Sequence, residues 1–230
     1  MTQNTGSEKM HADDVVVLVD FDGTITEEDV GVLLLKQYST TDWERLEARF
    51  ARGEVDIQQN MQQQFSYVQH DAAALIEYAR TVVTIRPGWQ EFVRYCSATG
   101  LKLAVVSGGL DFYVHGLLPL SNPPPDVHSL LAVYSTDAGG QVTLPDADDG
   151  DGEPEGFKEA VVRRYRRRYS HVWFIGNGVS DRGAARVADR LWAVEPLLSW
   201  CCANDINASS FKTFDDVREE FKALLARTDG

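Results

Sequence analysis

The sequence has few cysteines and no long apolar run. Its three cysteines, Cys96, Cys201 and Cys202, match neither the disulfide framework of a small secreted protein nor the spacing of a zinc site. No stretch approaches the roughly 20 apolar residues that a membrane-spanning helix needs. Residues 1–14 are polar and lack the apolar core of a signal peptide. We therefore expect a cytoplasmic protein that does not bind membranes.

Positive charge is also scarce. The chain has 22 Lys and Arg against 35 Asp and Glu, which gives a formal net charge of -13. Such a surface repels nucleic acid and anionic lipid, and we expect neither as a partner. A run of arginines at positions 163, 164, 166, 167 and 168 is therefore interpreted as a solvated helix face. The sequence favours no particular oligomeric state.

Four short apolar runs predict buried parallel strands. They alternate little between apolar and polar residues, as strands covered on both faces do, and helical patterns lie between them. The runs are Val15–Val19, Leu101–Val106, His171–Ile175 and Leu191–Val194. The predicted fold class is therefore α/β, with a Rossmann-like parallel sheet. Because ligands bind at the carboxyl ends of such strands, the turns at Asp20, Ser107 and Gly176 are expected to converge on one site.

The first two predicted strands are separated by far more residues than one crossover helix needs. This stretch predicts several helices, at Glu27–Tyr38, Thr41–Arg52, Val55–Val68 and Ala72–Val82. We interpret residues 30–85 as a small helical cap that closes over the site, and residues 13–29 and 86–230 as the catalytic core. Basic residues of this cap are candidate substrate contacts, namely Lys36, Arg45, Arg49 and Arg52.

The segment that carries the chemistry follows the first strand directly. It reads Asp20-Phe21-Asp22-Gly23-Thr24. Two carboxylates that leave a buried strand in a glycine turn can divide two tasks, because one can attack as a nucleophile while the other acts as general acid and base. A divalent cation would relieve the repulsion between them and neutralise phosphate oxygens.

This segment resembles the first motif of the haloacid dehalogenase superfamily of phosphatases. The other motifs follow in the expected order. They are Val105-Val106-Ser107-Gly108-Gly109, then Lys158 at the start of a predicted helix, and then Ile175-Gly176-Asn177-Gly178-Val179-Ser180-Asp181. The resemblance spans residues 15 to about 195, and a helical insertion after the first motif is typical of the phosphoserine phosphatase branch.

The resemblance implies a haloacid dehalogenase-like core with a small cap, and a Mg²⁺-dependent phosphatase acting on a small phosphorylated metabolite. It implies that Asp20 is the nucleophile, that Asp22 is the general acid and base, and that Lys158 offsets negative charge. Groups expected to hold the phosphate are Thr24, Ser107 and Gly108. Mg²⁺ is expected at Asp20, Asp22, Asn177 and Asp181.

Within this branch the chain most resembles the methionine-salvage phosphatases that act on 2-hydroxy-3-keto-5-methylthiopentenyl-1-phosphate. The features that carry this resemblance are Trp43-Glu44, Ile85-Arg86-Pro87-Gly88 and the run from Ser107 to Val114. Two departures concern the site. Asn177 stands where the fourth motif usually has Asp, and an acidic loop, Pro145–Gly156, precedes Lys158 where some of these relatives have a Cys-rich stretch.

Other functions stay open at this point. Phosphoserine or another small phosphate ester is the alternative substrate. The same residues could also pass the phosphoryl group from Asp20 to an acceptor alcohol, as in a phosphotransferase. A non-catalytic phosphate-binding protein would agree with Asn177, although both Asp20 and Asp22 are present.

Overall fold

A parallel sheet forms the centre of the molecule. The computed structural model describes residues 11–68, 70–118, 125–130 and 156–226. Within these residues the sheet has six strands in the order β3-β2-β1-β4-β5-β6, and every pairing is parallel. The strands are β1 Val15–Val19, β2 Lys102–Leu110, β3 Asp126–Leu130, β4 His171–Gly176, β5 Arg190–Ala193 and β6 Ser209–Ser210. The predicted α/β fold with a parallel core is confirmed.

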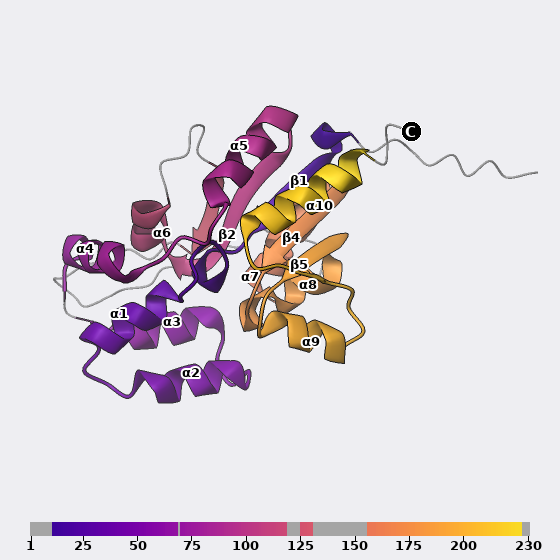
Figure 1. The fold of residues 1–230 in the computed structure, drawn as a ribbon. Coiled ribbons are helices and arrows are strands. Elements are labelled where there is room, and N and C mark those ends of the chain that lie inside the picture. The colour runs from indigo at the N-terminus through magenta and orange to yellow at the C-terminus, as the bar shows by residue number, and fades with distance from the viewer. Residues whose placement is uncertain (1–10, 69, 119–124, 131–155, 227–230) are drawn as a thin grey trace, which may run out of the picture.

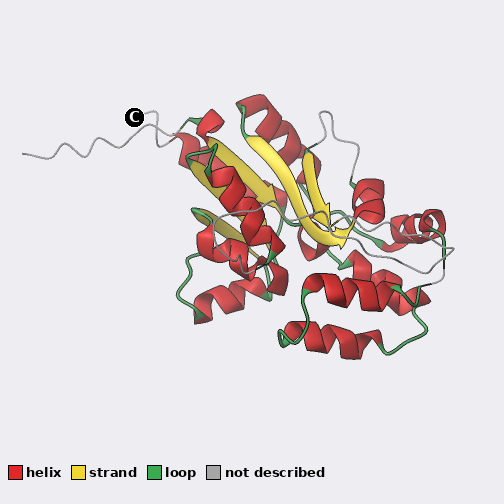
Figure 2. Ribbon diagram, turned by 180° about the vertical axis from the view of Figure 1, so that it is seen from behind, coloured by secondary structure: helices red, strands yellow, loops and turns green. Residues whose placement is uncertain are grey.

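Helices cover both faces of this sheet (Figures 1 and 2). The helices of the core are α5 Trp89–Thr99, α6 Asp111–Leu117, α7 Phe157–Arg166, α8 Arg182–Val187, α9 Leu197–Ala203 and α10 Phe214–Ala226. Helices α5 and α10 pack on one face, and α7, α8 and α9 pack on the other. Gly88 and Gly100 flank α5, both in the left-handed conformation that favours glycine.

Strand β1 contributes to two separate cores. Val15, Val17 and Val19 belong to the apolar cluster shared with α5 and α10, whereas Val16 and Leu18 belong to the cluster shared with α7, α8 and α9. Successive side chains of a strand point to opposite faces, so a strand covered on both faces must be apolar at every position. This explains the unbroken apolar run in the sequence, and it leaves Asp20 as the first polar residue at the end of the strand.

The insertion between β1 and β2 begins with four helices, α1 Val30–Tyr38, α2 Trp43–Ala51, α3 Ile57–Phe65 and α4 Ala72–Val82. Figure 1 shows α1, α2 and α3 beyond the end of the sheet to which β1 points. The first three helices begin two or three residues later than the sequence pattern predicts. In each, an aspartate caps the N-terminus through its side chain, namely Asp29, Asp42 or Asp56. An aspartate that binds the backbone N–H two or three residues ahead stays outside the helix, which sets the later start.

The two ends of this insertion are paired with each other. Thr26 and Ile85 form an antiparallel bridge. The N–H of Glu27 donates to the carbonyl of Thr84 at 2.9 Å, and the N–H of Arg86 donates to that of Ile25 at 2.7 Å. The inserted helices therefore leave and rejoin the core at the same place.

Other elements differ from the prediction or were not predicted. Strand β2 continues beyond the predicted end at Val106 and reaches Leu110. Its register with β3 shifts between Ser107 and Leu110. Ser107 therefore lies within a strand and not in the turn after it. Strands β3 and β6 and helices α6, α9 and α10 had no counterpart in the prediction. Most of the predicted acidic loop, residues 145–155, lies outside the described residues.

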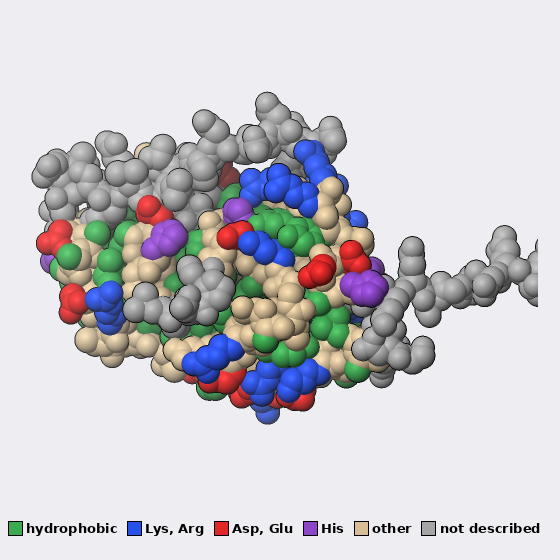
Figure 3. Space-filling model, turned by 90° about the horizontal axis from the view of Figure 1, so that it is seen from above, with side chains coloured by type: hydrophobic (Ala, Val, Ile, Leu, Met, Phe, Trp, Pro, Cys, Tyr) green, Lys and Arg blue, Asp and Glu red, His purple; other side chains and the backbone are tan. Residues whose placement is uncertain are grey.

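The arginine run lies at the C-terminal end of α7 and just after it. Arg163, Arg166, Arg167 and Arg168 are exposed. Arg163 pairs with Glu159, and Arg166 pairs with Asp189. Figure 3 shows Lys and Arg side chains in several separate groups across one face of the molecule, with Asp and Glu among them. In the part of the chain that the structure describes, no helix is both long enough and apolar enough to span a bilayer.

Phe221 of α10 joins the aromatic side chains of three elements. Its ring centroid lies 4.6 Å from that of Trp173, 4.7 Å from that of Trp192 and 5.3 Å from that of Phe92, and the side chain is fully buried. We predict that Phe221→Ala lowers the free energy of unfolding by about 3–5 kcal/mol, because it leaves a cavity among rings that cannot collapse. Denaturant unfolding measures this loss. Lys222→Ala, at an exposed neighbouring position, is the control and should change stability by less than about 0.5 kcal/mol.

Candidate active site

Asp20 lies at the end of β1 and is held by its own turn. Its side chain is 3% exposed. Oδ1 accepts a hydrogen bond from the N–H of Phe21 at 2.7 Å, and Oδ2 accepts a longer one from Thr24 Oγ1 at 3.3 Å. Gly23 turns the chain back with φ +73°, and a Cβ at that position would lie 2.0 Å from Asn177 Nδ2. Glycine is therefore required both by the backbone angle and by the close packing of Asn177.

Lys158 connects the first motif to the fourth. This residue of α7 is 3% exposed, and its Nζ lies 2.6 Å from Asp20 Oδ1 and 2.6 Å from Asp181 Oδ1. Asp181 Oδ2 accepts hydrogen bonds from the N–H groups of Asn177 and Gly178, both at 2.8 Å. Lys158 is therefore a buried residue of the site, as the resemblance implied. The side chain of Asp181 makes no capping hydrogen bond to α8 and orders the loop before that helix.

The pKa values of Asp20 and Lys158 indicate that the site has too little positive charge for its buried carboxylates. Burial and the negative charge of Asp181 raise the pKa of Asp20 to about 7, although Lys158 opposes the shift. Burial alone would lower the pKa of Lys158, but Asp181 and Asp20 outweigh it and raise that pKa above its usual value. Lys158 therefore carries its proton, and one ammonium group does not fully compensate the buried carboxylates.

Asp22 faces the cap. Its Oδ1 accepts a hydrogen bond from the N–H of Val30, the first residue of α1, at 3.0 Å, and its Oδ2 accepts one from the hydroxyl of Tyr113 at 3.1 Å. Burial raises the pKa of Asp22 well above its usual value, and the negative charges of Asp29 and Asp20 add to this effect. Its carboxyl group can therefore keep a proton at a higher pH than an exposed aspartate does.

Tyr113 is a residue that the sequence analysis did not select. It is 1% exposed and comes from α6. Its hydroxyl reaches Asp22 because Gly109 has no side chain, since a Cβ there would lie 2.3 Å from the hydroxyl and 2.5 Å from Asp22 Oδ2. The sequence pointed to Tyr113 only indirectly, because it lies in the run from Ser107 to Val114 that resembles the methionine-salvage phosphatases.

Arg86 was also noted only within a resemblance. Its guanidinium donates to the carbonyl of Thr24 at 2.7 Å and to that of Gly23 at 2.8 Å, and it reaches the carbonyl of Lys212 at 3.2 Å. The side chain is partly buried against the ring of Phe211. Arg86 thus fixes the turn that follows Asp20 from the point where the insertion rejoins the core.

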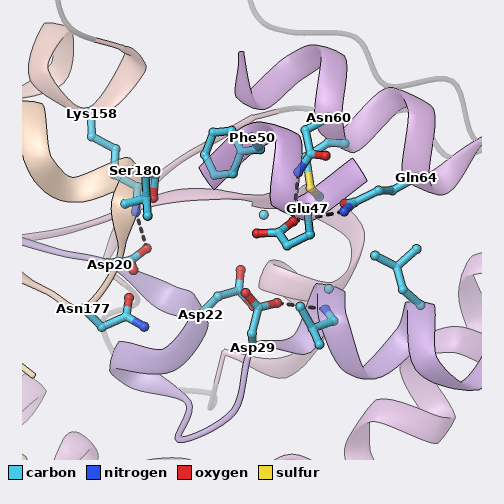
Figure 4. A pocket seen from close by; sticks show the side chains of 18 of the residues that line it. Asp20, Asp22, Asp29, Glu47, Phe50, Asn60, Gln64, Lys158, Asn177 and Ser180 are labelled. Atoms are coloured by element: carbon cyan, nitrogen blue, oxygen red, sulfur yellow. Dashed lines mark hydrogen bonds and ion pairs between the residues drawn. The ribbon is translucent and has the colours of Figure 1, made fainter. Parts of the chain in front are cut away.

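A cavity of about 260 Å³ lies between this site and the cap (Figure 4). Of the predicted site residues, those that line it are Asp20, Asp22, Gly108, Lys158 and Asn177. Thr24, Ser107 and Asp181 are fully buried and do not line it. Ser107 Oγ accepts a hydrogen bond from the N–H of Gly109 at 2.9 Å, so it holds the strand end in shape. The predicted cap contacts Lys36, Arg45, Arg49 and Arg52 are not among the lining residues.

The donors at this site suit a hard divalent cation. Asp20 and Asn177 provide a carboxylate and an amide oxygen, which Mg²⁺ prefers to nitrogen or sulfur. Both residues line the same cavity, on the side where Figure 4 labels them together with Lys158. Among the described residues no three His, Cys, Asp or Glu side chains form a metal-binding group, so a cation here would also need backbone oxygen or water. The raised pKa of Asp20 shows that additional positive charge would be favourable.

The family profile of haloacid dehalogenase-like hydrolases matches residues 17–186. The chain belongs to this family. The matched residues run from β1 into α8 and so include all four motifs of the site. The predicted enzyme class, a phosphoric monoester hydrolase of the haloacid dehalogenase type, is confirmed by this match and by the phosphatases that the chain resembles.

Two of these relatives are 2-hydroxy-3-keto-5-methylthiopentenyl-1-phosphate phosphatases. The one from Geobacillus kaustophilus (strain HTA426) is 30% identical over 214 residues, which covers 91% of this chain and 96% of the relative. The one from Bacillus cereus (strain AH187) is 28% identical over 218 residues, which covers 92% and 97%. The crystal structure of phosphoserine phosphatase from T. onnurineus is similar in fold, with a TM-score of 0.66 at 17% identity over 94% of this chain and 98% of that one.

The ion pairs of Lys158 predict a pH-dependent loss of stability in Lys158→Met. Methionine leaves Asp20 and Asp181 buried without their cation, which should cost about 3–5 kcal/mol of unfolding free energy at pH 8. The pKa of Asp20 is already raised to about 7, so the ionised group destabilises the folded chain increasingly as pH rises from about 4. Removal of Lys158 raises that pKa further. The deficit relative to wild type should therefore be smaller at pH 5 than at pH 8.

Denaturant unfolding of both proteins in EDTA at these two pH values makes the measurement. Lys102→Met, which removes a partly exposed ion pair with Asp126, is the matched control. A deficit for Lys158→Met that is equal at both pH values would contradict the electrostatic account.

Proposed function

We propose that this chain is a cytoplasmic, Mg²⁺-dependent phosphomonoesterase that works through an aspartyl-phosphate on Asp20. The observation that carries the proposal is the buried carboxylate of Asp20 at the end of β1, held on one side by Lys158 and opening on the other into a cavity beside Asp22. A nucleophile, a carboxyl group with a raised pKa and a fixed ammonium group are the parts that phosphoryl transfer requires.

In the first step, Asp20 Oδ2 forms a bond to phosphorus while the ester P–O bond breaks. Oδ2 is the more available oxygen, because its one hydrogen bond is long and Oδ1 is held by Lys158 and by the N–H of Phe21. Asp22 gives its proton to the departing alkoxide, a task that its raised pKa favours. In the second step, Asp22 takes a proton from water as the water oxygen attacks phosphorus. The bond to Asp20 breaks and phosphate leaves.

Several groups would stabilise the phosphoryl oxygens. Lys158 supplies a positive charge that cannot move away, and Gly108, which lines the cavity, is proposed to donate its N–H to a phosphoryl oxygen. Thr24 and Ser107 do not line the cavity, so we assign them the task of holding Asp20 and the end of β2 in place. Mg²⁺ would be held by Asp20, the carbonyl of Asp22 and Asn177, and would neutralise charge on the phosphate. Both oxygens of Asp181 already accept hydrogen bonds, so we assign it the task of positioning Lys158 and the Asn177 loop.

The proposed substrate is 2-hydroxy-3-keto-5-methylthiopentenyl-1-phosphate. Its support is the similarity to phosphatases of that name over nearly the whole length of both chains. Phosphoserine or another small phosphate ester is the alternative. We further propose that residues 30–85 act as a cap that excludes water during turnover, and that residues 13–29 and 86–230 act as the catalytic core.

The first test is phosphate release from a panel of small phosphate esters, including these two, with Mg²⁺ or EDTA. We expect turnover by wild type with Mg²⁺ only, and a loss of at least about 10³-fold in Asp20→Asn, because the amide is not a nucleophile. Asp13→Asn, outside the site, should retain full activity. Absence of phosphate release by folded wild type from every ester would contradict the proposal. In that case, transfer products formed with added alcohols would identify a phosphotransferase.

The second test concerns Asn177. An amide removes one negative charge from the proposed cation site, so Asn177→Asp should bind Mg²⁺ about tenfold more tightly, since the added charge acts at close range in a buried site. The substitution hardly changes the volume of the side chain, and the packing against Gly23 is therefore kept. The dependence of turnover on Mg²⁺ concentration, together with calorimetric titration, measures the effect. An affinity that is unchanged or weaker would contradict this role for Asn177.

A further inference from the structure

The wall of the cavity opposite Asp20 is built by the cap. Its polar part consists of Glu47 from α2 and of Asn60 and Gln64 from α3, and its apolar part of Leu35, Phe50 and Met61. Figure 4 shows Glu47 between the two amides, on the side of the cavity away from Lys158. Because Asp20 would hold phosphorus on the core side, this wall is the part of the cavity that is left for the group esterified to the phosphate.

The hydrogen bonds of this wall orient its groups. Glu47 Oε2 accepts one hydrogen bond from Asn60 Nδ2 and one from Gln64 Nε2, both at 3.0 Å. An ionised carboxylate only accepts hydrogen bonds, so both amide groups must turn their NH₂ toward it. Among the described residues, no hydrogen bond ends on Glu47 Oε1. A carboxylate oxygen at the cavity is thus available to a donor.

Asn60 keeps this orientation although it leaves one of its polar atoms without a partner in the part of the chain that the structure describes. Its side chain is 1% exposed, and its carbonyl oxygen Oδ1 is buried without a hydrogen-bond partner among the described residues. The bond to Glu47 prevents the amide from turning this oxygen elsewhere. A buried acceptor without a donor is costly, so the bond to Glu47 fixes the Asn60 amide against an energetic penalty.

The charge of the cavity restricts the ligand further. Four of its lining side chains are carboxylates, Asp20, Asp22, Asp29 and Glu47, and Lys158 is the only Lys or Arg among its described lining residues. Lys158 is already shared by Asp20 and Asp181. Of the basic residues of the cap, Arg49 and Arg52 pair with Glu54. A substrate carboxylate would therefore meet Glu47 and Asp29 with no free cation to receive it.

We infer that Glu47, supported by Asn60 and Gln64, selects phosphate esters whose esterified group carries no carboxylate, donates a hydrogen bond to Glu47, for example through a hydroxyl, and has a short apolar tail. The tail would lie against Phe50 and Met61. Esters whose esterified group carries a carboxylate and no ammonium group are disfavoured by charge. This inference rests on the proposed function for the placement of the phosphate at Asp20, and it assigns the specificity of that site to three side chains of the cap.

A matched series of ligands tests it, consisting of pentyl phosphate, 2-hydroxypentyl phosphate and 4-carboxybutyl phosphate. For wild type we expect kcat/KM to be about tenfold higher for the hydroxy ester than for pentyl phosphate, because pentyl phosphate leaves Glu47 without a hydrogen-bond donor. We expect kcat/KM to be about tenfold lower for the carboxylate ester than for pentyl phosphate, because its negative charge lies near that of Glu47. Glu47→Gln keeps the shape and removes the charge. It should raise kcat/KM for the carboxylate ester relative to pentyl phosphate by about tenfold.

Glu44→Gln, at an exposed position of the same helix, is the control and should leave both ratios unchanged. A gain in activity cannot result from misfolding, which protects the test against a merely unstable variant. Equal ratios in wild type and Glu47→Gln, or efficient hydrolysis of the carboxylate ester by wild type, would overturn the inference.

Binding separates this inference from the proposed function. Calorimetric affinities of the three esters for Asp20→Asn, with and without Glu47→Gln, need no turnover. If wild type hydrolyses none of the esters while Asp20→Asn binds the hydroxy ester most tightly through Glu47, the proposed function fails and the selectivity stands. If wild type turns over the esters while the three affinities are equal, the proposed function stands and the selectivity fails.

Discussion

The buried ammonium group of Lys158 is the interaction on which the rest of the site depends. It is bonded to Asp20 after β1 and to Asp181 in the loop after β4, and it comes from α7 on one face of the sheet. Three segments that are far apart in sequence are thereby fixed by one charge. Since removing Lys158 would leave both carboxylates buried without a cation, its loss is strongly unfavourable. This gives Asp20, the proposed nucleophile, a defined position before any ligand arrives.

The same site is not electrically balanced. The raised pKa values of Asp20 and Asp22 show that their carboxylates are held in an environment that disfavours their charge. An ordinary stabilising network would lower these values. Here the folded chain keeps two destabilised carboxylates at the point where a cation and a phosphate would be bound. Strongly shifted pKa values of this kind are common at functional sites, where groups are positioned for chemistry at the expense of stability. Asp29 and Glu47 extend this negative character toward the cap, so charge also becomes a means of choosing the substrate.

Much of this arrangement could be predicted from the sequence, because the signals are local. The apolar run Val15–Val19 followed by Asp20 predicted both a strand and the place of the nucleophile, and Lys158 was selected from its position between two motifs. The starts of the first three helices were predicted two or three residues early, since the pattern alone does not show that Asp29 or Asp42 would serve as a cap, whereas the start of α4 at Ala72 was predicted correctly. Tyr113, Arg86 and Glu47 were not selected as site residues. Their contacts join residues at least 13 positions apart, which no local pattern contains.

The pairing of the two ends of the insertion has an evolutionary consequence. Thr26 bridges to Ile85, and Arg86 holds the carbonyls of Gly23 and Thr24 as soon as the chain returns to the core. The turn that presents Asp20 is thus stabilised from outside the inserted helices. Segments of other lengths and compositions can be exchanged between these two points while the nucleophile keeps its place. The position of Asp20 therefore does not depend on the composition of the cavity wall that the inserted helices build, and that wall can change without displacing it.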